Sequence, residues 1–308
     1  MKVIACTGIV VLIMIVLFSI SLYFYHVAVK RANKSFLTHN PDLELKSIPQ
    51  RREIWKKDPG FEEITITSED GLKLQGYWLE AAMPTSKTVI LSHGYSGKAR
   101  DMDLLAKLYH EQCGYHVLMP DARGHGRSEG GYIGFGWRER KDYVQWVKAI
   151  MEKKGSHSQI VLHGVSMGGA TVCMTSGEAL PSNVKAIISD CSYTSVLAQL
   201  TYQLKRMYRL PAFPLVYCTS LLTRMRAGYF FSEASALEQV KKSRTPMLFI
   251  HGEDDTFVPF KMVKELYAAC SSEKELYTVP GAGHGLAYSV DPGKYTKKVE
   301  AFLGKYVG

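Results

Sequence analysis

The chain has 308 residues, of which 46% are hydrophobic and 22% charged, and its formal net charge is +9. This composition excludes a disordered or low-complexity chain, and the length allows one globular domain together with a membrane anchor. The six cysteines form no Cys-x-x-Cys pair and no Cys/His cluster with zinc spacing, which excludes the common zinc modules and favours free thiols in a reducing compartment.

The first element along the chain is an apolar segment, because residues 3–29 contain no Lys, Arg, Asp or Glu. About 20 apolar residues suffice to cross a bilayer as a helix, and the aromatic residues 23–25 suit the membrane interface. A cleavable signal peptide is the alternative, but its apolar region would be shorter, about 7–15 residues. The sequence therefore predicts an uncleaved transmembrane anchor over residues 1–30.

A basic linker is predicted for residues 31–60. From Lys30 to Asp58 there are eight basic residues and four acidic ones, which favours attraction to anionic headgroups, with a solvated linker as the alternative. More positive charge follows the apolar segment than precedes it. The positive-inside rule thus predicts a single-pass protein of the cell membrane with its C-terminal domain in the cytoplasm.

From residue 61 to residue 308 the chain alternates between strand and helix patterns. Residues 61–81 alternate apolar and polar side chains around Asp70-Gly71, which predicts a β-hairpin. Short apolar runs typical of buried strands follow in KTVILSHGY, YHVLMPDARGHG, SQIVLHGVSMGG, VKAIISDCS and TPMLFIHGEDD. This alternation predicts an α/β domain with a mostly parallel central sheet covered by helices on both faces.

One block, about residues 195–235, interrupts the alternation with two amphipathic helical stretches separated by Pro211 and Pro214. An insertion at the carboxyl ends of the strands would cover the active face, so we predict a small helical cap. The alternative is a helical hairpin on the flank of the sheet. An apolar cap suits an acyl chain. The predicted substrate-binding residues are Tyr95, Phe213, Tyr217 and Phe257.

The pattern G-x-S-x-G occurs once with a strand pattern before it and a helix pattern after it, in GVSMG around Ser166. Such an elbow would lift the Ser166 hydroxyl out of the sheet and aim the Met167 amide at the group it attacks. We assign the second amide of an oxyanion hole to Tyr95, in LSHGYSG. An idle serine in a glycine-rich turn is the alternative.

A serine nucleophile needs a base, and the base needs an acid to orient it. We predict His284 as the base, because it lies in the glycine-flanked loop PGAGHG and follows the serine in chain order. The acid is expected between them: Asp255 directly follows a buried strand in HGEDDTFVP, and Asp254 and Asp190 are the alternatives. His251, at the end of that strand, is expected to be structural.

The motifs HGYSG, DARGHGRSEG, HGVSMGG, HGEDDTFVP and GAGHG, in this order, resemble the α/β-hydrolase superfamily. Within it, the chain is similar to the serine aminopeptidase and acyl-thioester hydrolase-like branch and to membrane-anchored bacterial hydrolases. The resemblance covers about residues 60–308 and implies an α/β-hydrolase fold with two-step acyl transfer. It implies Ser166, Asp255 and His284 as the triad and the amides of Tyr95 and Met167 as oxyanion donors.

These observations predict a serine hydrolase of the carboxylesterase, lipase or thioesterase type that cleaves a small-molecule or lipid-like hydrophobic acyl substrate. A serine peptidase on the same triad, an acyltransferase and a non-catalytic scaffold are the alternatives. The sequence lacks nucleotide-binding spacing and a metal-ligand set, and its basic residues are not interleaved with aromatics. We therefore expect no cofactor, no metal and no nucleic-acid partner; the oligomeric state does not follow from the sequence.

Overall fold

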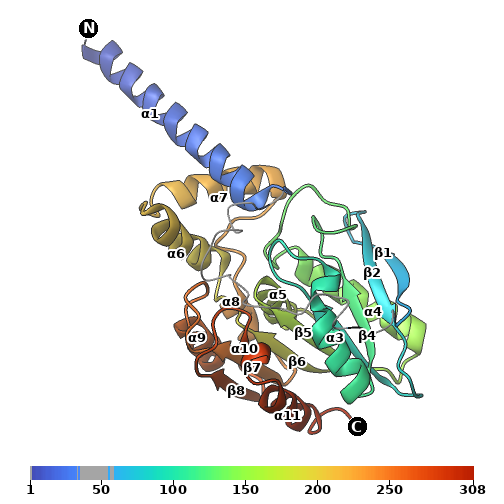
Figure 1. The fold of residues 1–308 in the computed structure, drawn as a ribbon. Coiled ribbons are helices and arrows are strands. Elements are labelled where there is room, and N and C mark those ends of the chain that lie inside the picture. Colours follow the sequence, from blue (N-terminus) through green and yellow to red (C-terminus); the bar gives the residue numbers. More distant parts are fainter. Residues whose placement is uncertain (1, 33, 35–54, 56–58) are drawn as a thin grey trace.

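The structure, a computed structural model, describes residues 2–32, 34, 55 and 59–308. Most of the basic linker predicted for residues 31–60 lies outside these ranges. Within them, a long N-terminal helix projects from an α/β body, and the last helix lies at the opposite end of that body (Figure 1).

The described part of the body is built on one eight-stranded sheet with the order β1-β2-β4-β3-β5-β6-β7-β8. Strands β1 and β2 form the antiparallel hairpin that the alternating pattern predicts, β2 pairs antiparallel with β4, and all other neighbours are parallel. The prediction of a mostly parallel sheet is confirmed. The strands are β1 (Glu62–Thr67), β2 (Lys73–Leu79), β3 (Lys87–Ser92), β4 (His116–Pro120), β5 (Gln159–Val165), β6 (Val184–Asp190), β7 (Met247–Gly252) and β8 (Lys274–Val279).

Helices cover both faces of the sheet, and two buried apolar clusters fill the space between them. One face carries α4 (Glu139–Lys154), α5 (Met167–Thr175), α8 (Ala236–Val240) and α9 (Lys261–Ala269). The other carries α3 (Asp103–Lys107) with its flanking turns Ala99–Met102 and Leu108–Gln112, α10 (Ala287–Val290) and α11 (Pro292–Leu303). The inner strands β3, β5, β6 and β7 are almost wholly buried, as expected for a sheet covered on both sides.

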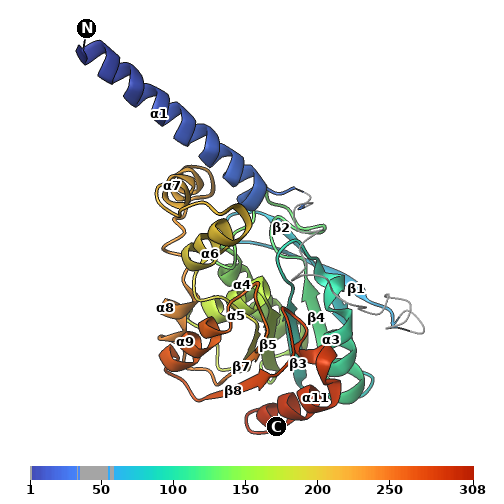
Figure 2. The same cartoon turned by 60° about the vertical axis from the view of Figure 1, so that its left-hand side comes forward.

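Two further helices, α6 (Val196–Tyr208) and α7 (Leu215–Ala227), occupy the block that interrupts the alternation. We call residues 195–235 the helical insertion. The Ser195 hydroxyl caps α6 by accepting from the Ala198 amide at 3.1 Å. Both helices lie between the base of the N-terminal helix and the rest of the body (Figures 1 and 2).

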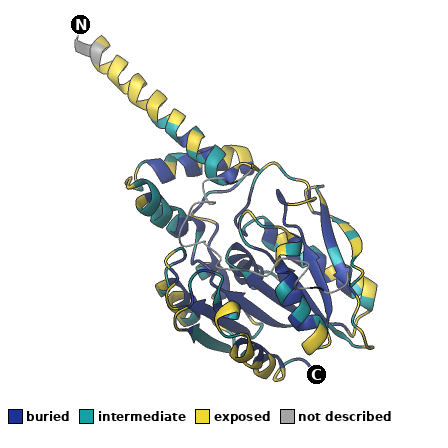
Figure 3. Ribbon diagram, viewed as in Figure 1, coloured by how far each residue is buried: buried dark blue, intermediate teal, exposed yellow. Residues whose placement is uncertain are grey.

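The N-terminal helix α1 (Lys2–Phe24) continues into a wider helical turn, Tyr25–Val29. It is long and apolar enough to cross a membrane. Its described side chains are exposed over most of its length and become buried only where it meets the body (Figure 3). Tyr25 and Val29 belong to the apolar core itself.

The end of α1 is tied to the body by backbone and side-chain hydrogen bonds, and we call this region the anchor junction. The Tyr95 hydroxyl donates to the carbonyl of Ala28 at 2.7 Å, and the Ile133 amide donates to the carbonyl of Val29 at 2.7 Å. The Arg31 guanidinium donates to backbone carbonyls of the loop 126–130. The N-terminal helix and the α/β body are therefore packed together on both sides of residue 30.

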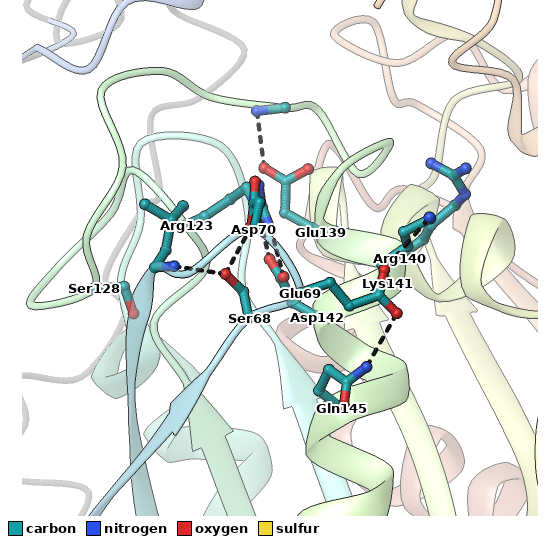
Figure 4. A network of polar contacts seen from close by, with 12 residues as sticks. Ser68, Glu69, Asp70, Arg123, Ser128, Glu139, Arg140, Lys141, Asp142 and Gln145 are labelled. Carbon is teal, nitrogen blue, oxygen red and sulfur yellow. Dashed lines mark hydrogen bonds and ion pairs between the residues drawn. The ribbon is translucent and has the colours of Figure 1, made fainter. Parts of the chain in front are cut away.

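The loop DARGHGRSEG is held by a buried polar network (Figure 4). The Arg123 guanidinium donates to both oxygens of Asp142 at 2.6 Å and to the oxygens of Asp70 at 2.8 and 3.0 Å. This hydrogen bonding lowers the pKa of Asp70 to about 2. Glu139 accepts from the amides of Gly134 and Gly136 beside the network. The network fixes the loop that receives Arg31 at the anchor junction.

Candidate active site

Ser166 lies in the sharp turn between β5 and α5, with φ 58° and ψ −117°. A positive φ is rare for a residue with a Cβ and signals a strained backbone held by its surroundings. A Cβ at Gly164 would collide with the carbonyl of Gly168, and a Cβ at Gly168 would collide with the carbonyl of Ser92. The two glycines of the G-x-S-x-G pattern are therefore required by close backbone approach, as this elbow predicts.

The structure brings His284 and Asp255 to this serine. The Nε2 atom of His284 lies 2.7 Å from Oγ of Ser166, and its Nδ1 atom lies 2.7 Å from Oδ2 of Asp255. His284 comes from the loop between β8 and α10, and Asp255 from the loop after β7. A carboxylate at Nδ1 leaves Nε2 free to accept the serine proton, so this arrangement can activate the hydroxyl for nucleophilic attack.

The Asp255 carboxylate is surrounded by donors. Its Oδ1 accepts from the amides of Phe257 and Val258 at 2.9 and 2.8 Å. Burial alone would raise the pKa of Asp255, but the imidazoles of His284 and His251 outweigh burial and hold this pKa below its ordinary value. The group is therefore ionised at neutral pH and can support a positive charge on His284.

His251, which was expected to be structural, contacts the acid Asp255. Its Nε2 atom lies 3.2 Å from Oδ2 of Asp255 and 3.0 Å from the carbonyl of Val258. Both neighbours are acceptors, so Nε2 carries the proton and donates. Its signal in the sequence was its place at the end of β7, four residues before the acid.

The two alternative acids lie elsewhere. Asp254 is exposed to solvent. Asp190 is buried and accepts from the Tyr295 hydroxyl at 2.9 Å, and burial raises the pKa of Asp190 to about 6. Of the three carboxylates, Asp255 is the one hydrogen-bonded to His284.

Two cavities meet at Ser166. The first has a volume of about 110 Å³ and an almost wholly apolar lining from the helical insertion, the elbow and the end of α1. The second is a wider cleft of about 710 Å³ with a more polar lining that includes Lys34, Asp101 and His284. Tyr95, Ser166 and Phe257 line both. The hydroxyl thus lies between an apolar compartment and a polar one.

The structure places two of the four predicted substrate-binding residues, Tyr95 and Phe257, at these cavities. It does not bring Phe213 and Tyr217 there: both lie on the outer surface, with 75% and 52% of their areas exposed. Tyr217 points outward because the rotation of α7 turns Leu215, Val216 and Thr219 toward the cavity instead. Phe213 lies in the loop before α7 and is exposed there.

The apolar cavity has a wall that the sequence analysis missed. Phe24, the last residue of α1, and Val27 and Ala28 of the following turn line it together with residues of the helical insertion. Apolar side chains at the end of a transmembrane segment carry no signal that distinguishes a lipid contact from a cavity wall.

The loop after β3 approaches the serine closely, because a Cβ at Gly94 would lie 3.6 Å from Cβ of Ser166. The Tyr95 ring next to it stacks on Phe135 with centroids 5.4 Å apart. Burial raises the pKa of Tyr95, so its hydroxyl stays protonated and serves as the donor to Ala28.

Among the described residues, Cys191, Asp255 and His284 form one group whose potential metal-ligating atoms lie within 4.8 Å of one another. Burial raises the pKa of the Cys191 thiol well above its usual value, which disfavours the thiolate that a metal needs. Asp255 and His284 already bond to each other. These atoms are better suited to proton transfer than to metal binding.

Comparisons with known proteins agree on the architecture. The sequence profile of the prolyl oligopeptidase family, Peptidase_S9, matches residues 102–308. The uncharacterized protein YqkD of Bacillus subtilis is 31% identical over 244 residues, which cover 78% of each chain. The lysophosphatidylserine lipase ABHD12 of Danio rerio is 30% identical over 207 residues, covering 65% of this chain and 51% of that protein. The solved structure of the Pyrococcus furiosus esterase Pf2001 superposes with a TM-score of 0.64 at 26% identity, covering 81% of this chain and 93% of that one.

Proposed function

The chain belongs to the prolyl oligopeptidase family of α/β-hydrolases, and from this premise we propose that it cleaves ester or thioester bonds of hydrophobic acyl substrates with Ser166 as nucleophile. The esterase- and lipase-like class follows from its relatives; the residue roles and the substrate are our proposal. The observation that carries it is the continuous hydrogen-bond chain from Ser166 through His284 to Asp255, with both links at 2.7 Å.

The reaction proceeds in two halves. Ser166 Oγ forms a bond to the substrate carbonyl carbon while its proton passes to Nε2 of His284, and the Asp255 carboxylate supports the resulting imidazolium. The tetrahedral intermediate then expels the alcohol or thiol, which takes that proton. Water repeats the attack on the acyl-serine with His284 as base, and the acid product leaves with Ser166 restored.

The oxyanion of each intermediate is held by the amides of Tyr95 and Met167 in this proposal. Met167 begins α5, so its amide belongs to the positive end of a helix. Within the described residues, neither amide donates to a side chain or to a carbonyl outside its own helix or strand. One such donor is worth about 10²–10³ in rate.

The two cavities support an acyl ester over a peptide. The narrow apolar cavity suits the acyl chain, and the wider polar cleft suits the leaving group. The lipase and esterase activities named for relatives fit this division. A serine peptidase, favoured by the family name, is the second candidate.

A fluorophosphonate probe tests the nucleophile. We expect the full chain to be labelled, and Ser166→Ala to abolish labelling while the thermal unfolding midpoint stays near that of the wild type. Ser289→Ala, a serine that lines the same wide cleft, is the matched control and should retain labelling. Labelling that persists in Ser166→Ala would exclude this residue as the nucleophile.

A substrate panel separates the candidates. We expect p-nitrophenyl esters to be hydrolysed faster as the acyl chain lengthens, until the apolar cavity is filled. Aminoacyl anilides should be poor substrates. Faster turnover of the anilides would favour the peptidase instead.

We also propose that α1 spans the cell membrane with the hydrolase domain in the cytoplasm, from the charge that follows the apolar segment. Met83 is highly exposed, so a Met83→Cys protein offers an accessible thiol on the body. An impermeant maleimide should label this site only after cells are lysed. Labelling of Met83→Cys in intact cells beyond that of the wild type would reverse the orientation.

A further inference from the structure

The outer side of the helical insertion carries an unusual concentration of exposed apolar side chains. Tyr217, Leu221 and Met225 recur every four residues along α7 and so share one face of that helix. The loop before α7 adds two more exposed apolar residues. We call the whole set the outer apolar face: Leu210, Phe213, Tyr217, Leu221 and Met225.

The helical insertion that carries this face is rich in positive charge. The sequence between Asp190 and Glu233 contains no acidic residue but five basic ones, which are Lys205, Arg206, Arg209, Arg224 and Arg226. Arg224 approaches Glu233 at 4.0 Å and donates to the carbonyl of Gly228. Apolar residues next to a cationic rim are typical of helices that lie in the interface of an anionic bilayer.

The length of α1 fixes where this face lies relative to a membrane. The described side chains of residues 4–16 are exposed, whereas Leu17, Ile20, Leu22 and Phe24 pack against the core. Residues 4–16 extend only about 20 Å as a helix, but a bilayer core is about 30 Å thick. A spanning α1 therefore needs the segment from Leu17 to about Tyr23 inside the bilayer, and α7 packs against that segment.

Several contacts fix the position of the helical insertion relative to the N-terminal helix. The rings of Phe24 and Tyr208 meet edge to face with centroids 5.2 Å apart, and the Arg226 guanidinium lies 5.2 Å from the centroid of the Tyr25 ring. Figures 1 and 2 show α7 beside the base of α1 in both views. If α1 enters the membrane to its full apolar length, α7 enters with it.

We infer that the outer apolar face is a membrane-docking surface, inserted at the level where acyl chains meet headgroups in the anionic bilayer that α1 spans. This inference rests on the membrane insertion of α1 and is independent of the hydrolase reaction. Interfacial helices of this kind insert their apolar face about 5–10 Å deep. The docked surface also brings the anchor side of the apolar cavity next to the lipid.

Depth-dependent quenching of tryptophan tests the surface. The full chain is reconstituted in vesicles of phosphatidylcholine and phosphatidylglycerol, with and without bromine on the acyl chains, as the wild type and as single Met→Trp variants. The chain has four native tryptophans, so the wild-type signal is subtracted. We expect bromine to quench the added emission of Met225→Trp strongly.

Met83→Trp is the matched control, because Met83 and Met225 have 74% and 76% of their areas exposed, and Met83 lies beyond the far end of β2, away from α1. Its added emission should not change with bromine. Equal responses of the two variants would overturn the docking surface.

Ile13→Trp reports on α1 itself, because Ile13 is exposed on the projecting part of that helix. Quenching of Ile13→Trp without quenching of Met225→Trp would show that α1 is inserted while α7 stays in water or on another protein, and the inference would fail. No quenching of Ile13→Trp would also overturn it. Hydrolysis of a soluble ester by the same samples reports separately on the proposed function.

Discussion

Two regions border the space at Ser166, and they are built by different means. One is the set of loops that follow β5, β7 and β8; the other is the anchor junction. In the loops, each polar side chain follows a strand of the sheet, and the parallel arrangement brings the ends of these strands together. At the junction, apolar segments around residues 24–29, 95, 133 and 215 meet from distant parts of the chain.

Because the two regions are built differently, we expect the loops to control the chemical step and the junction to control the choice of acyl chain. The loops carry short directional hydrogen bonds that activate the serine in the proposed mechanism, so their loss should remove a chemical step. The junction carries packing, in which each residue contributes a share of the wall and changes the space available to a substrate. Changes in the loops should therefore stop the reaction, and changes at the junction should alter which acyl chain reacts.

The largest effect is expected from Asp255→Asn. Without the carboxylate, the imidazole of His284 loses both its tautomeric control and its compensating charge, so kcat should fall by about 10⁴ on a short-chain ester. The neighbouring Asp254→Asn, which changes an exposed carboxylate, should leave kcat within about threefold of the wild type. If both variants lost activity equally, the loop after β7 would act through its fold and not through one carboxylate.

The second-largest effect is expected on stability and comes from the buried Asp190, at the end of β6. Its folded pKa of about 6 lies above the unfolded value, so the folded state binds more protons at this group, and the contribution of Asp190 to stability falls as pH rises between about 4 and 6. The loss amounts to at most about 3 kcal/mol. Asp190→Asn should remove this pH dependence, which denaturation at a series of pH values would measure; an unchanged slope would contradict the role of Asp190.

A change at the junction should act on selectivity. Ala28→Phe fills part of the apolar cavity, so kcat/KM for a long-chain ester should fall by about 10–100-fold while that for an acetyl ester is kept. Ile13→Phe, on the exposed part of α1, is the control and should change neither value. An equal loss for both esters would place the effect on folding instead of on the wall.

The smallest effect is expected on stability, from removing the hydrogen bond between Tyr95 and the anchor junction. Tyr95→Phe removes the hydrogen bond to the Ala28 carbonyl but keeps the ring, and should lower the free energy of unfolding by about 1 kcal/mol. Tyr217→Phe, which alters an exposed ring, should have no measurable effect. A stability equal to that of the wild type in Tyr95→Phe would show that the bond adds nothing to the junction.

Much of the fold was predictable because strands, helices and tight turns each leave a local pattern. The hairpin at Asp70-Gly71, the elbow around Ser166 and the strand-end positions of Asp255 and His284 all follow from such patterns. His251 was not recognised as a partner of the acid, since its contact depends on the path of the loop after β7. Phe213 and Tyr217 were predicted to bind the substrate but line neither cavity, because an aromatic residue in or beside a helix does not reveal whether it faces inward.

By itself, the sequence determined an α/β sheet with a nucleophile elbow, two strand-end partners and an apolar N-terminal helix, since each depends on residues close together in the chain. Only the tertiary structure decided that the segment at the end of this helix is a wall of the cavity and that Phe213 and Tyr217 of the helical insertion face outward. The physical reason is that the spacing of apolar residues indicates which face of a helix avoids water. It does not indicate whether protein, substrate or lipid covers that face.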